Sequence, residues 1–286
     1  MKKVIVILGL LIFMIGCPKP PPQPPEPNPT PRTPPVFSNK ILGLTLDNTA
    51  KLSDIVSSLK AMPSKPWVRI VFDYPYPASD YKTAVTAISK VAVVVGQPSD
   101  STYSAKMSVS QFEKRFKDYV DTLPEVDIWE TCNECNGDWA GNNTPAQTDK
   151  ALALVKASGK KSMFVPYWNT PTCMDKHGEY KAWTQKNISS YVKNNTDYVM
   201  ISIYGMDCDG PEPTYAQMDS EIAYFKAMFP SAVVGIGEYG AKKSEDKEKI
   251  MQYYLKYPQL GFGGYWYGFQ DLVPKTKTLW KTFITR

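Results

Sequence analysis

Short runs of β-branched and aromatic residues alternate with stretches of helical periodicity over most of this chain. The segment 108–123 is one such stretch, and it places Phe112, Phe116 and Tyr119 on one face of a helix. Strands that alternate with helices predict an α/β fold with a parallel sheet, and eight repeats in about 250 residues are typical of one (β/α)₈ (TIM) barrel. The eight strand-like runs are 41–46, 67–72, 91–96, 126–132, 162–167, 198–204, 232–238 and 261–266.

A second helical segment, 144–159, carries its own boundary signals. Thr144 suits the N-cap, Pro145 suits the first helical position, and Gly159 suits the C-terminal stop. The sequence therefore predicts a helix between the fourth and fifth strand-like runs.

The chain begins with a charged and then strongly apolar segment. Two lysines follow the first Met, and the apolar run 4–15 is long enough for a secretory signal but too short for an ordinary membrane span. Its end, Met-Ile-Gly-Cys, resembles the lipobox of bacterial lipoproteins. The resemblance implies that a signal peptide, residues 1–16, is removed and that Cys17 is lipidated and anchors the protein to a membrane. A simple export signal with a free cysteine is the alternative.

The next segment, residues 17–35, is rich in proline, with eleven prolines between residues 18 and 35. This composition cannot bury a core and favours extended polyproline II, so we predict a disordered linker that spans roughly 50 Å. A ligand for proline-recognising domains is the alternative, which the position directly after the lipobox disfavours. Residues 36–286 are then predicted to form one folded domain.

In a parallel barrel the functional site lies at the C-terminal ends of the strands and in the loops that follow them. Two glutamates occupy such positions, because Glu134 follows the fourth strand-like run and Glu238 closes the seventh. Two carboxyl groups at one barrel mouth are the arrangement with which sugar-cleaving enzymes hold an acid/base and a nucleophile. The predicted strand ends carry Asp47, Arg69, Asp73, Tyr74, Gln97, Asn133, Glu134, Tyr167, Trp168, Tyr204, Asp207, Glu238, Tyr239, Trp266 and Gln270.

These positions resemble glycoside hydrolase clan A, whose retaining (β/α)₈ enzymes have an Asn-Glu pair ending strand four and a Glu ending strand seven. In this chain Asn133-Glu134 and Glu238 match that pattern, and the resemblance covers the whole barrel. Further matches on strands two, six and eight are Arg69, Tyr204 and Trp266.

The resemblance implies a role for each matched residue. Glu134 would be the acid/base and Glu238 the nucleophile of a double displacement, with the two carboxyl groups about 5 to 5.5 Å apart. Asn133 would bind the sugar 2-hydroxyl. Arg69 and Tyr204 would keep the nucleophile ionised and oriented.

Two of these roles have structural alternatives. Arg69 could instead pair with Asp73 or Glu130 as part of the barrel. Trp266 would be the floor under the sugar ring at the cleavage point, and the alternative is a barrel plug. Further aromatic residues follow the strands and could stack on sugar faces, which favours a polysaccharide or oligosaccharide; they are Tyr74, Tyr76, Trp139, Trp168 and Tyr267.

Four cysteines, Cys132, Cys135, Cys173 and Cys208, follow strands four to six and so lie at the predicted mouth. In an exported protein an even number of cysteines predicts two disulfides, with three possible pairings. Adjacent loops favour Cys135 with Cys173. The rival interpretation is a four-cysteine zinc site, because Cys132 and Cys135 have the C-x-x-C spacing, but a metal there would crowd Glu134.

The chain also departs from the clan pattern. Cys135 follows the Asn-Glu pair where many members have Pro, and Ser202 stands where several families have His. The only histidine, His177, lies in a polar loop, so a His-based triad or metal site is excluded. The resemblance therefore names the clan and leaves the family and the substrate open.

We predict a monomeric, lipid-anchored retaining β-glycosidase of the endo-acting glucanase or mannanase type that needs no cofactor or metal. A transglycosidase would use the same residues, and a non-catalytic glycan-binding lipoprotein on the same barrel is the alternative from another class. The net charge of +5 falls to about +3 without the signal, and no basic run suggests nucleic acid as a partner. Pro18 is not the Asp that retains some lipoproteins in the inner membrane, so the outer membrane or cell surface is favoured.

Overall fold

The computed structural model describes residues 42–169, 178–205, 211–241, 243, 246–257, 264–266 and 269–284. Within these residues nine strands form one parallel sheet. They are β1 (Leu42–Leu46), β2 (Trp67–Val71), β3 (Val93–Gln97), β4 (Ile128–Asn133), β5 (Lys161–Val165), β6 (Tyr167–Trp168), β7 (Tyr198–Ile203), β8 (Val233–Tyr239) and β9 (Gly264–Trp266).

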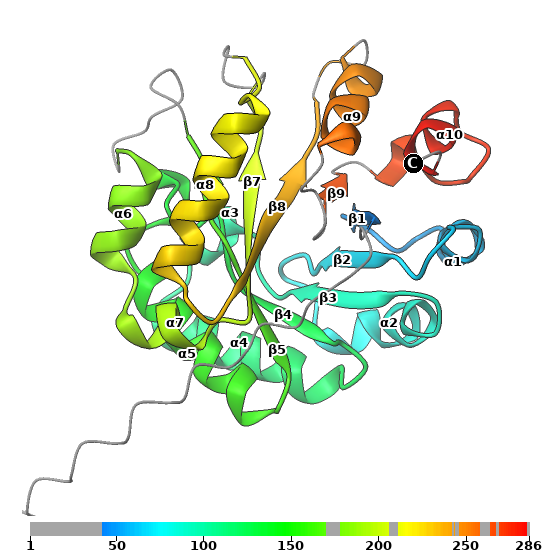
Figure 1. The fold of residues 1–286 in the computed structure, drawn as a ribbon. Helices are drawn as coiled ribbons and strands as arrows, with labels where there is room; N and C mark the ends of the chain where they lie inside the picture. The colour runs from blue at the N-terminus through cyan, green and yellow to red at the C-terminus, as the bar shows by residue number, and fades with distance from the viewer. Residues whose placement is uncertain are drawn as a thin grey trace, which may run out of the picture. The chain divides into compact units, whose positions relative to one another are not determined.

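The strand pairings run around the whole barrel. They lead from β1 through β2, β3 and β4 to β5, from β5 to β7, and through β8 and β9 back to β1. The helices lie outside this ring (Figure 1). The (β/α)₈ barrel predicted from the sequence is therefore confirmed, and each predicted strand has its counterpart.

The fifth predicted strand is interrupted at one residue. Pro166 separates β5 from the two-residue strand β6, because proline has no N–H to donate to a neighbouring strand. Its carbonyl still accepts a hydrogen bond from the Ser202 N–H of β7 at 2.9 Å. Since β6 pairs only with β7, β5 and β6 together take the place of one barrel strand.

The described helices follow the strands in the order that the alternation predicted. The α-helices are α1 (Leu52–Lys60), α2 (Lys82–Ser89), α3 (Ser101–Ser104), α4 (Val109–Thr122), α5 (Thr144–Ala157), α6 (Tyr180–Asn187), α7 (Ser190–Asn195), α8 (Tyr215–Met228), α9 (Lys247–Lys256) and α10 (Thr278–Ile284). Three 3₁₀ helices are η1 (Ala78–Tyr81), η2 (Asp138–Ala140) and η4 (Phe269–Asp271).

Helix α4 matches its prediction, and α5 differs from its prediction at the first residue. In α4 the side chain of Ser108 caps the helix, and Phe112, Phe116 and Tyr119 are buried together. Helix α5 begins at Thr144, whose hydroxyl donates to the carbonyl of Ala140 at 2.9 Å and so does not act as an N-cap acceptor. The predicted N-cap role is therefore wrong.

The core has two parts, one on each side of the strands. The larger part lies between the strands and the helices. The smaller part fills the barrel interior with Trp67, Val95, Ile128, Met163, Val165, Tyr198 and Met200. Because these interior residues include the first residues of β2, β4 and β7, they fill the N-terminal half of the barrel and leave space at its C-terminal end.

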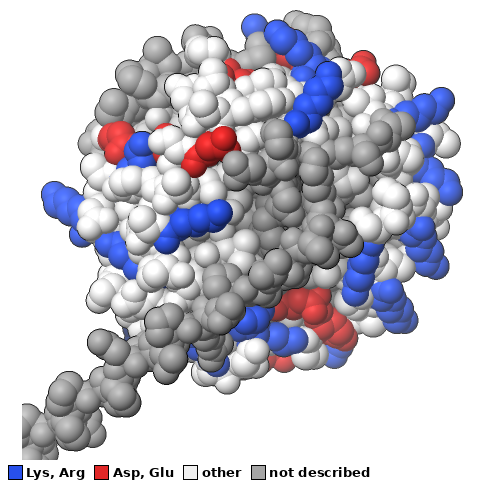
Figure 2. Space-filling model, viewed as in Figure 1, with Lys and Arg blue, Asp and Glu red and all other residues white. Residues whose placement is uncertain are grey.

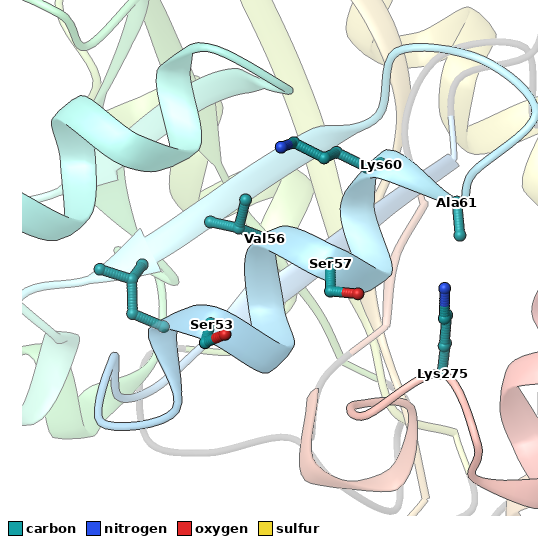
Figure 3. Close-up of a pocket in the computed structure, with 7 residues that line it drawn as sticks. Ser53, Val56, Ser57, Lys60, Ala61 and Lys275 are labelled. Carbon is teal, nitrogen blue, oxygen red and sulfur yellow. The ribbon is translucent and has the colours of Figure 1, made fainter.

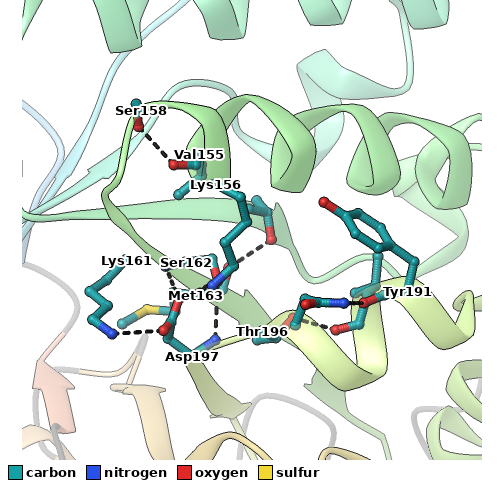
Figure 4. Close-up of polar contacts among 12 residues, drawn as sticks. Val155, Lys156, Ser158, Lys161, Ser162, Met163, Tyr191, Thr196 and Asp197 are labelled. Carbon is teal, nitrogen blue, oxygen red and sulfur yellow. Dashed lines mark hydrogen bonds and ion pairs between the residues drawn. The ribbon is translucent and has the colours of Figure 1, made fainter. Parts of the chain in front are cut away.

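A polar cluster ties the strands together at the N-terminal end of the barrel (Figure 4). Asp197, just before β7, accepts hydrogen bonds from Lys156 at 2.5 Å, from Lys161 at 2.9 Å, and from the backbone and hydroxyl of Ser162. Burial alone would raise the pKa of Asp197, but the hydrogen bonds from the two lysines lower it. The cluster joins α5, β5 and β7 far from the C-terminal ends of the strands.

The surface of the barrel mixes both signs of charge. On the face shown in Figure 2, Lys and Arg side chains lie around the edge with Asp and Glu side chains among them. In the described part of the chain, no helix combines the length and apolar character that crossing a bilayer would require.

Candidate active site

A cavity of about 1040 Å³ opens at the C-terminal ends of the strands. Its position agrees with the rule that the loops after the strands of such a barrel build the site. The cavity is lined by Asp47, Arg69, Val71, Asp73, Gln97, Asp100, Ser101, Thr102, Tyr103, Asn133, Glu134, Trp139, Tyr167, Tyr204, Glu238, Ala241, Lys247, Gln270 and Asp271. The cavity brings together six of the residues that the sequence predicted to bind or cleave sugar, namely Arg69, Asn133, Glu134, Trp139, Tyr204 and Glu238.

Glu134 lies directly after β4 in an unusual backbone conformation. Its φ of 46° is uncommon for a residue with a side chain, and such conformations cluster at functional sites. The buried Ser202 hydroxyl of β7 donates to its Oε1 at 2.7 Å. Burial raises the pKa of Glu134 to about 7, and the hydrogen bond from Ser202 and the charge of Arg69 act in the opposite direction. At neutral pH this carboxyl is therefore able to give and take a proton.

Glu238 has a different environment at the end of β8. It is 8% exposed, its Oε1 accepts a hydrogen bond from the Tyr204 hydroxyl, and its Oε2 forms an ion pair with Arg69. A cation and a hydrogen-bond donor both favour the charged form of a carboxyl group. The two glutamates thus share one cavity in contrasting surroundings.

Arg69 of β2 connects this site with the barrel interior. Its Nε and Nη2 donate to the two carboxylate oxygens of Glu130 at 2.7 and 3.2 Å, while Nη1 contacts Glu238. Arg69 therefore forms an ion pair with Glu130 within the barrel and is also a partner of Glu238, so both interpretations of this residue apply. Burial raises the pKa of Glu130, and Arg69 lowers it. Burial alone would lower the pKa of Arg69, but Glu130 and its other neighbours raise it.

Short elements after β3 and β4 hold the side chains of Asn133 and Trp139 at the rim of the cavity. The Ser101 N–H donates to Asn133 Oδ1, and the Ser101 hydroxyl accepts from Trp139 Nε1, both at 3.1 Å. The Trp139 ring meets Tyr167 edge to face with 5.1 Å between ring centroids. Gly137 lies so close to this indole that a Cβ there would overlap it. Asn133 also hydrogen-bonds Glu130, which favours the ionised form of that carboxyl.

The loop between β4 and η2 is fixed to β6 by a reciprocal amide pair. Asn136 Nδ2 donates to the Tyr167 carbonyl at 2.8 Å, and the Tyr167 N–H donates to Asn136 Oδ1 at 2.7 Å. Asn136 is buried, so this pair competes little with water. It holds the segment after Glu134 against the strand that presents Tyr167 to the cavity.

Two predicted sugar-binding tryptophans lie outside the cavity. Trp266 is fully buried, pairs in register with Leu44 and Tyr239, and packs edge to face on Tyr239 within the core between strands and helices. Trp168 is also buried in that core. Successive side chains of a strand face opposite sides, and both tryptophans are on the helix side. The predictions that Trp266 is the floor of the site and that Trp168 binds substrate are therefore wrong.

Tyr74 lies beyond the rim and does not line the cavity. It is 49% exposed, and its ring packs against Tyr103, which does line the cavity, with 5.6 Å between centroids. The Arg115 guanidinium lies over the Tyr74 ring, 5.6 Å from the ring centroid. Tyr74 therefore supports Tyr103 from outside the cavity, and its direct contact with substrate stays a prediction.

The cysteines are described only in part. The Cα atoms of Cys132 and Cys135 are 5.7 Å apart, within the range that disulfides span, and both side chains are buried. A disulfide here stays a prediction, as does any pairing with Cys173 or Cys208, which lie outside the described residues. Among the described residues, no three His, Cys, Asp or Glu side chains are grouped closely enough to hold a metal ion.

A second hollow, of about 730 Å³, lies beside α1 (Figure 3). Its charged side chains are Lys60 and Lys275, and Ser53 and Ser57 supply hydroxyls. No carboxyl group is among its lining residues, whereas the cavity at the barrel mouth is lined by two glutamates.

Several site residues carried little signal in the sequence. Ser202 was visible only as a departure from the clan pattern, although it holds Glu134. Ser101 and Asp100 lie in a polar stretch that resembles an ordinary helix start, and Asp100 does cap α3. Only their position in the sequence could have indicated them, because all of these residues lie near or just after the C-terminal end of a barrel strand.

The fold of the chain is shared with known carbohydrate enzymes. No family model and no curated protein sequence matches it. A beta-mannanase from Thermomonospora fusca superposes with a TM-score of 0.54 at 15% identity over 82% of this chain and 79% of that chain. A broad-specificity endoglucanase from Clostridium acetobutylicum gives 0.54 at 14% identity over 80% and 87%. An FMN-binding beta-glucuronidase from Facaelibacterium prausnitzii gives 0.50 at 15% identity over 82% of this chain, which spans only 37% of that protein. At these identities the likeness establishes the common barrel.

Proposed function

We propose that the protein is a retaining glycoside hydrolase that cleaves β-glycosidic bonds of a polysaccharide or oligosaccharide. The observation that carries the proposal is the contrast between two glutamates in one cavity. Glu134 has a pKa raised to about 7 by burial, whereas Glu238 is ion-paired with Arg69 and accepts a hydrogen bond from Tyr204. A two-carboxylate mechanism needs this difference in protonation.

The first step assigns a separate task to each carboxyl group. Protonated Glu134 gives its proton to the glycosidic oxygen as that bond breaks, and the Glu238 carboxylate attacks the anomeric carbon to form a covalent glycosyl-enzyme. The Ser202 hydroxyl then stabilises the Glu134 carboxylate that remains. Arg69 and the Tyr204 hydroxyl keep the attacking oxygens of Glu238 oriented.

The second step reverses these tasks. Glu134, now ionised, removes a proton from water, and the resulting nucleophile displaces Glu238 from the anomeric carbon with overall retention. Because the pKa of Glu134 is near neutrality, one residue can serve as acid in the first step and as base in the second. A carboxyl separation of about 5 to 5.5 Å stays part of this proposal.

The cavity and its neighbours support a ligand of several sugar units. Its volume of about 1040 Å³ is at the upper end of typical ligand pockets, and Tyr103, Trp139 and Tyr167 add aromatic surface. Among proteins of the same fold, the Thermomonospora fusca mannanase has been solved in complex with mannohexaose and mannotriose. We therefore include mannans beside glucans among the substrates to be tested.

The test is hydrolysis of β-glucans, mannans, xylans and galactans by the wild-type protein, Glu134→Gln and Glu238→Gln. Loss of cleavage in both variants, together with a β-anomer as the first product seen by NMR, is the expected result. Cleavage with inversion would contradict the assignment of Glu238 as nucleophile. Glycan binding without cleavage on the whole panel would favour the non-catalytic lipoprotein.

We also propose that the enzyme is lipid-anchored through Cys17 and displayed on the cell envelope by the proline-rich linker. The support is the sequence alone, in which the apolar run ends in a lipobox-like motif followed by eleven prolines. Metabolic labelling with a fatty acid, compared between the wild-type protein and Cys17→Ser, tests the anchor. Equal labelling of the two proteins would contradict it.

A further inference from the structure

The charge of the cavity is strongly one-sided. Six acidic side chains line it, and its two basic side chains are already engaged. Arg69 is held between Glu130 and Glu238, and Lys247 pairs with Asp271 at 2.8 Å. Three aspartates therefore remain without a cationic partner among the lining residues, on the side of the cavity formed by β1, β2 and β3; they are Asp47, Asp73 and Asp100.

Of the three aspartates, Asp73 has the carboxylate that is most readily available to a ligand. Its carboxylate is partly buried, and no described residue donates a hydrogen bond to it. Burial raises the pKa of Asp73, and the negative charges of Asp47 and Asp100 raise it further. Arg115 lies nearby and lowers this pKa, but its N–H groups donate to backbone carbonyls, including that of Asp73 itself. The three aspartates thus act on one another across the cavity.

The other two aspartates are fixed in place. Asp47 accepts from Gln270 Nε2 at 2.8 Å, and Asp100 accepts from the backbone and the hydroxyl of Thr102 as the cap of α3. These contacts come from neutral groups, so neither carboxylate has a cationic partner among the residues that line the cavity. They form the fixed negative sides of the space around Asp73.

A buried amide oxygen that has no hydrogen-bond partner among the described residues lies on the same side of the cavity. Gln97 ends β3, pairs in register with Val71, and lines the cavity with a side chain that is only 1% exposed. No described group hydrogen-bonds its Oε1. A buried acceptor without a donor is rare in native proteins, and a bound ligand that supplies the donor is one explanation.

The side of the cavity formed by the three aspartates and Gln97 suits a ligand that donates hydrogen bonds and carries positive charge. A protonated amine offers three donors and no acceptor, whereas a sugar hydroxyl offers one donor, and a uronate would add a further negative charge. A metal ion does not fit, because no three acidic side chains in the described part of the chain are grouped closely enough to hold one. Carboxylates spread around a large cavity suit charges that are spaced along a chain.

We infer that the substrate is a β-glycan of amino sugars, whose ammonium groups are bound by Asp73 and Gln97 between Asp47 and Asp100. The inference rests on the proposed function, and it adds the chemical class of the substrate. Ammonium groups desolvated beside carboxylates form charge-assisted hydrogen bonds, which are stronger than those of neutral hydroxyls. Asp73 is then the residue that determines specificity, and it takes no part in bond cleavage.

The experiment compares four hexamers with the same β-1,4-linked backbone, namely those of glucosamine, N-acetylglucosamine, glucose and glucuronic acid. Their binding to the full-length Glu134→Gln variant is measured by calorimetry at low and high salt, and their hydrolysis by the wild-type protein is measured in parallel. We expect the glucosamine hexamer to bind about tenfold more tightly than the glucose hexamer at low salt. The preference should shrink at high salt, because salt screens partly exposed charges.

Substitutions locate the preference within the cavity. Asp73→Asn should abolish most of the tenfold preference by weakening the binding of the glucosamine hexamer more than that of the glucose hexamer. Asp54→Asn, an equal change of charge on the exposed face of α1, is the matched control and should leave the preference intact. Equal binding of the amine and hydroxyl hexamers, or a preference that survives Asp73→Asn, would overturn the inference.

The two proposals fail separately. Hydrolysis of the glucose hexamer without any advantage for glucosamine would retain the hydrolase and reject the amino-sugar specificity. Tight binding of the glucosamine hexamer that depends on Asp73, without hydrolysis of any hexamer, would reject the hydrolase and retain the binding specificity.

Discussion

The Ser202→Ala substitution tests whether one hydroxyl sets the proton affinity of Glu134. Ser202 is fully buried on β7, and its hydroxyl donates to Glu134 Oε1 at 2.7 Å. A hydrogen bond donated to a carboxylate favours the charged form and lowers the pKa. Removal of the hydroxyl should therefore raise the pKa of Glu134 above its value of about 7 in the wild-type protein.

The size of the change follows from the energy of this contact. A hydrogen bond to a charged group contributes about 1.5 to 3 kcal/mol, and a tenfold change in proton affinity corresponds to about 1.4 kcal/mol. The hydroxyl also contacts the neutral form of Glu134, so only part of that energy distinguishes the two protonation states. We expect the titration midpoint of Glu134 to rise by about one pH unit.

The assay is a carbon-13 NMR titration of the side-chain carboxyl groups, which needs no substrate. The Glu134 signal is assigned by its absence from the Glu134→Gln spectrum. If a substrate is known, the alkaline limb of the pH dependence of kcat/KM should move upward by the same amount, because the acid stays protonated to higher pH.

Ser57→Ala on the exposed face of α1 is the matched control, and it should leave the Glu134 midpoint where it is (Figure 3). A midpoint in Ser202→Ala that is unchanged or lower would refute the reasoning. It would mean that burial alone governs the acid and that the Ser202 contact serves packing.

Three further predictions concern stability, measured by denaturant unfolding. Glu130→Gln removes a bidentate partner of a fully buried Arg69 and should lower the free energy of unfolding by about 3 kcal/mol, and an effect under about 1 kcal/mol would refute it. Trp266→Ala should lower that free energy by about 3 to 5 kcal/mol, with oligosaccharide affinity of the folded protein unchanged, and weaker binding in the folded variant would restore its sugar-binding role. Asp197→Asn should cost about 1 to 2 kcal/mol at neutral pH. Because the folded pKa of Asp197 is lowered, this contribution is present above the unfolded value of roughly 3.9 and disappears as the pH falls through the folded value. A difference that persists in acid would contradict this assignment.

The sequence was sufficient to predict the barrel and the meeting of the two glutamates. Eight apolar runs of strand length, separated by helical segments, left few other arrangements. In a parallel barrel all C-terminal strand ends share one mouth, so Glu134 and Glu238 had to approach each other although 104 residues separate them. Periodicity and topology were enough to place both glutamates at the same barrel mouth, and no knowledge of side-chain conformations was required.

Trp168 and Trp266 show that the sequence did not reveal which side of its strand a residue faces. Side chains along a strand alternate between two faces, so an error of one residue in a strand end moves a side chain from the cavity to the helix layer. Tyr167 lines the cavity, and Trp168, its neighbour, is in the core. Trp266 shares its register with Leu44, an apolar residue that also faces the helices. Apolar strands buried on both faces show no alternation of polarity that would have revealed the direction.

The position of Arg69, the one arginine among the described residues that line the cavity, distinguishes the two proposed catalytic glutamates. Glu134 and Glu238 line the mouth, a third glutamate, Glu130, is buried nearby, and Arg69 contacts Glu130 and Glu238 directly. Its charge reaches Glu134 only across a distance, and Glu134 has the Ser202 hydroxyl as its hydrogen-bond donor. Among these three glutamates, the negative charge with the weakest compensation is the one that a proton removes most readily. The proposed roles of acid and nucleophile thus follow from the placement of one cation on β2, because the carboxyl groups themselves are chemically identical.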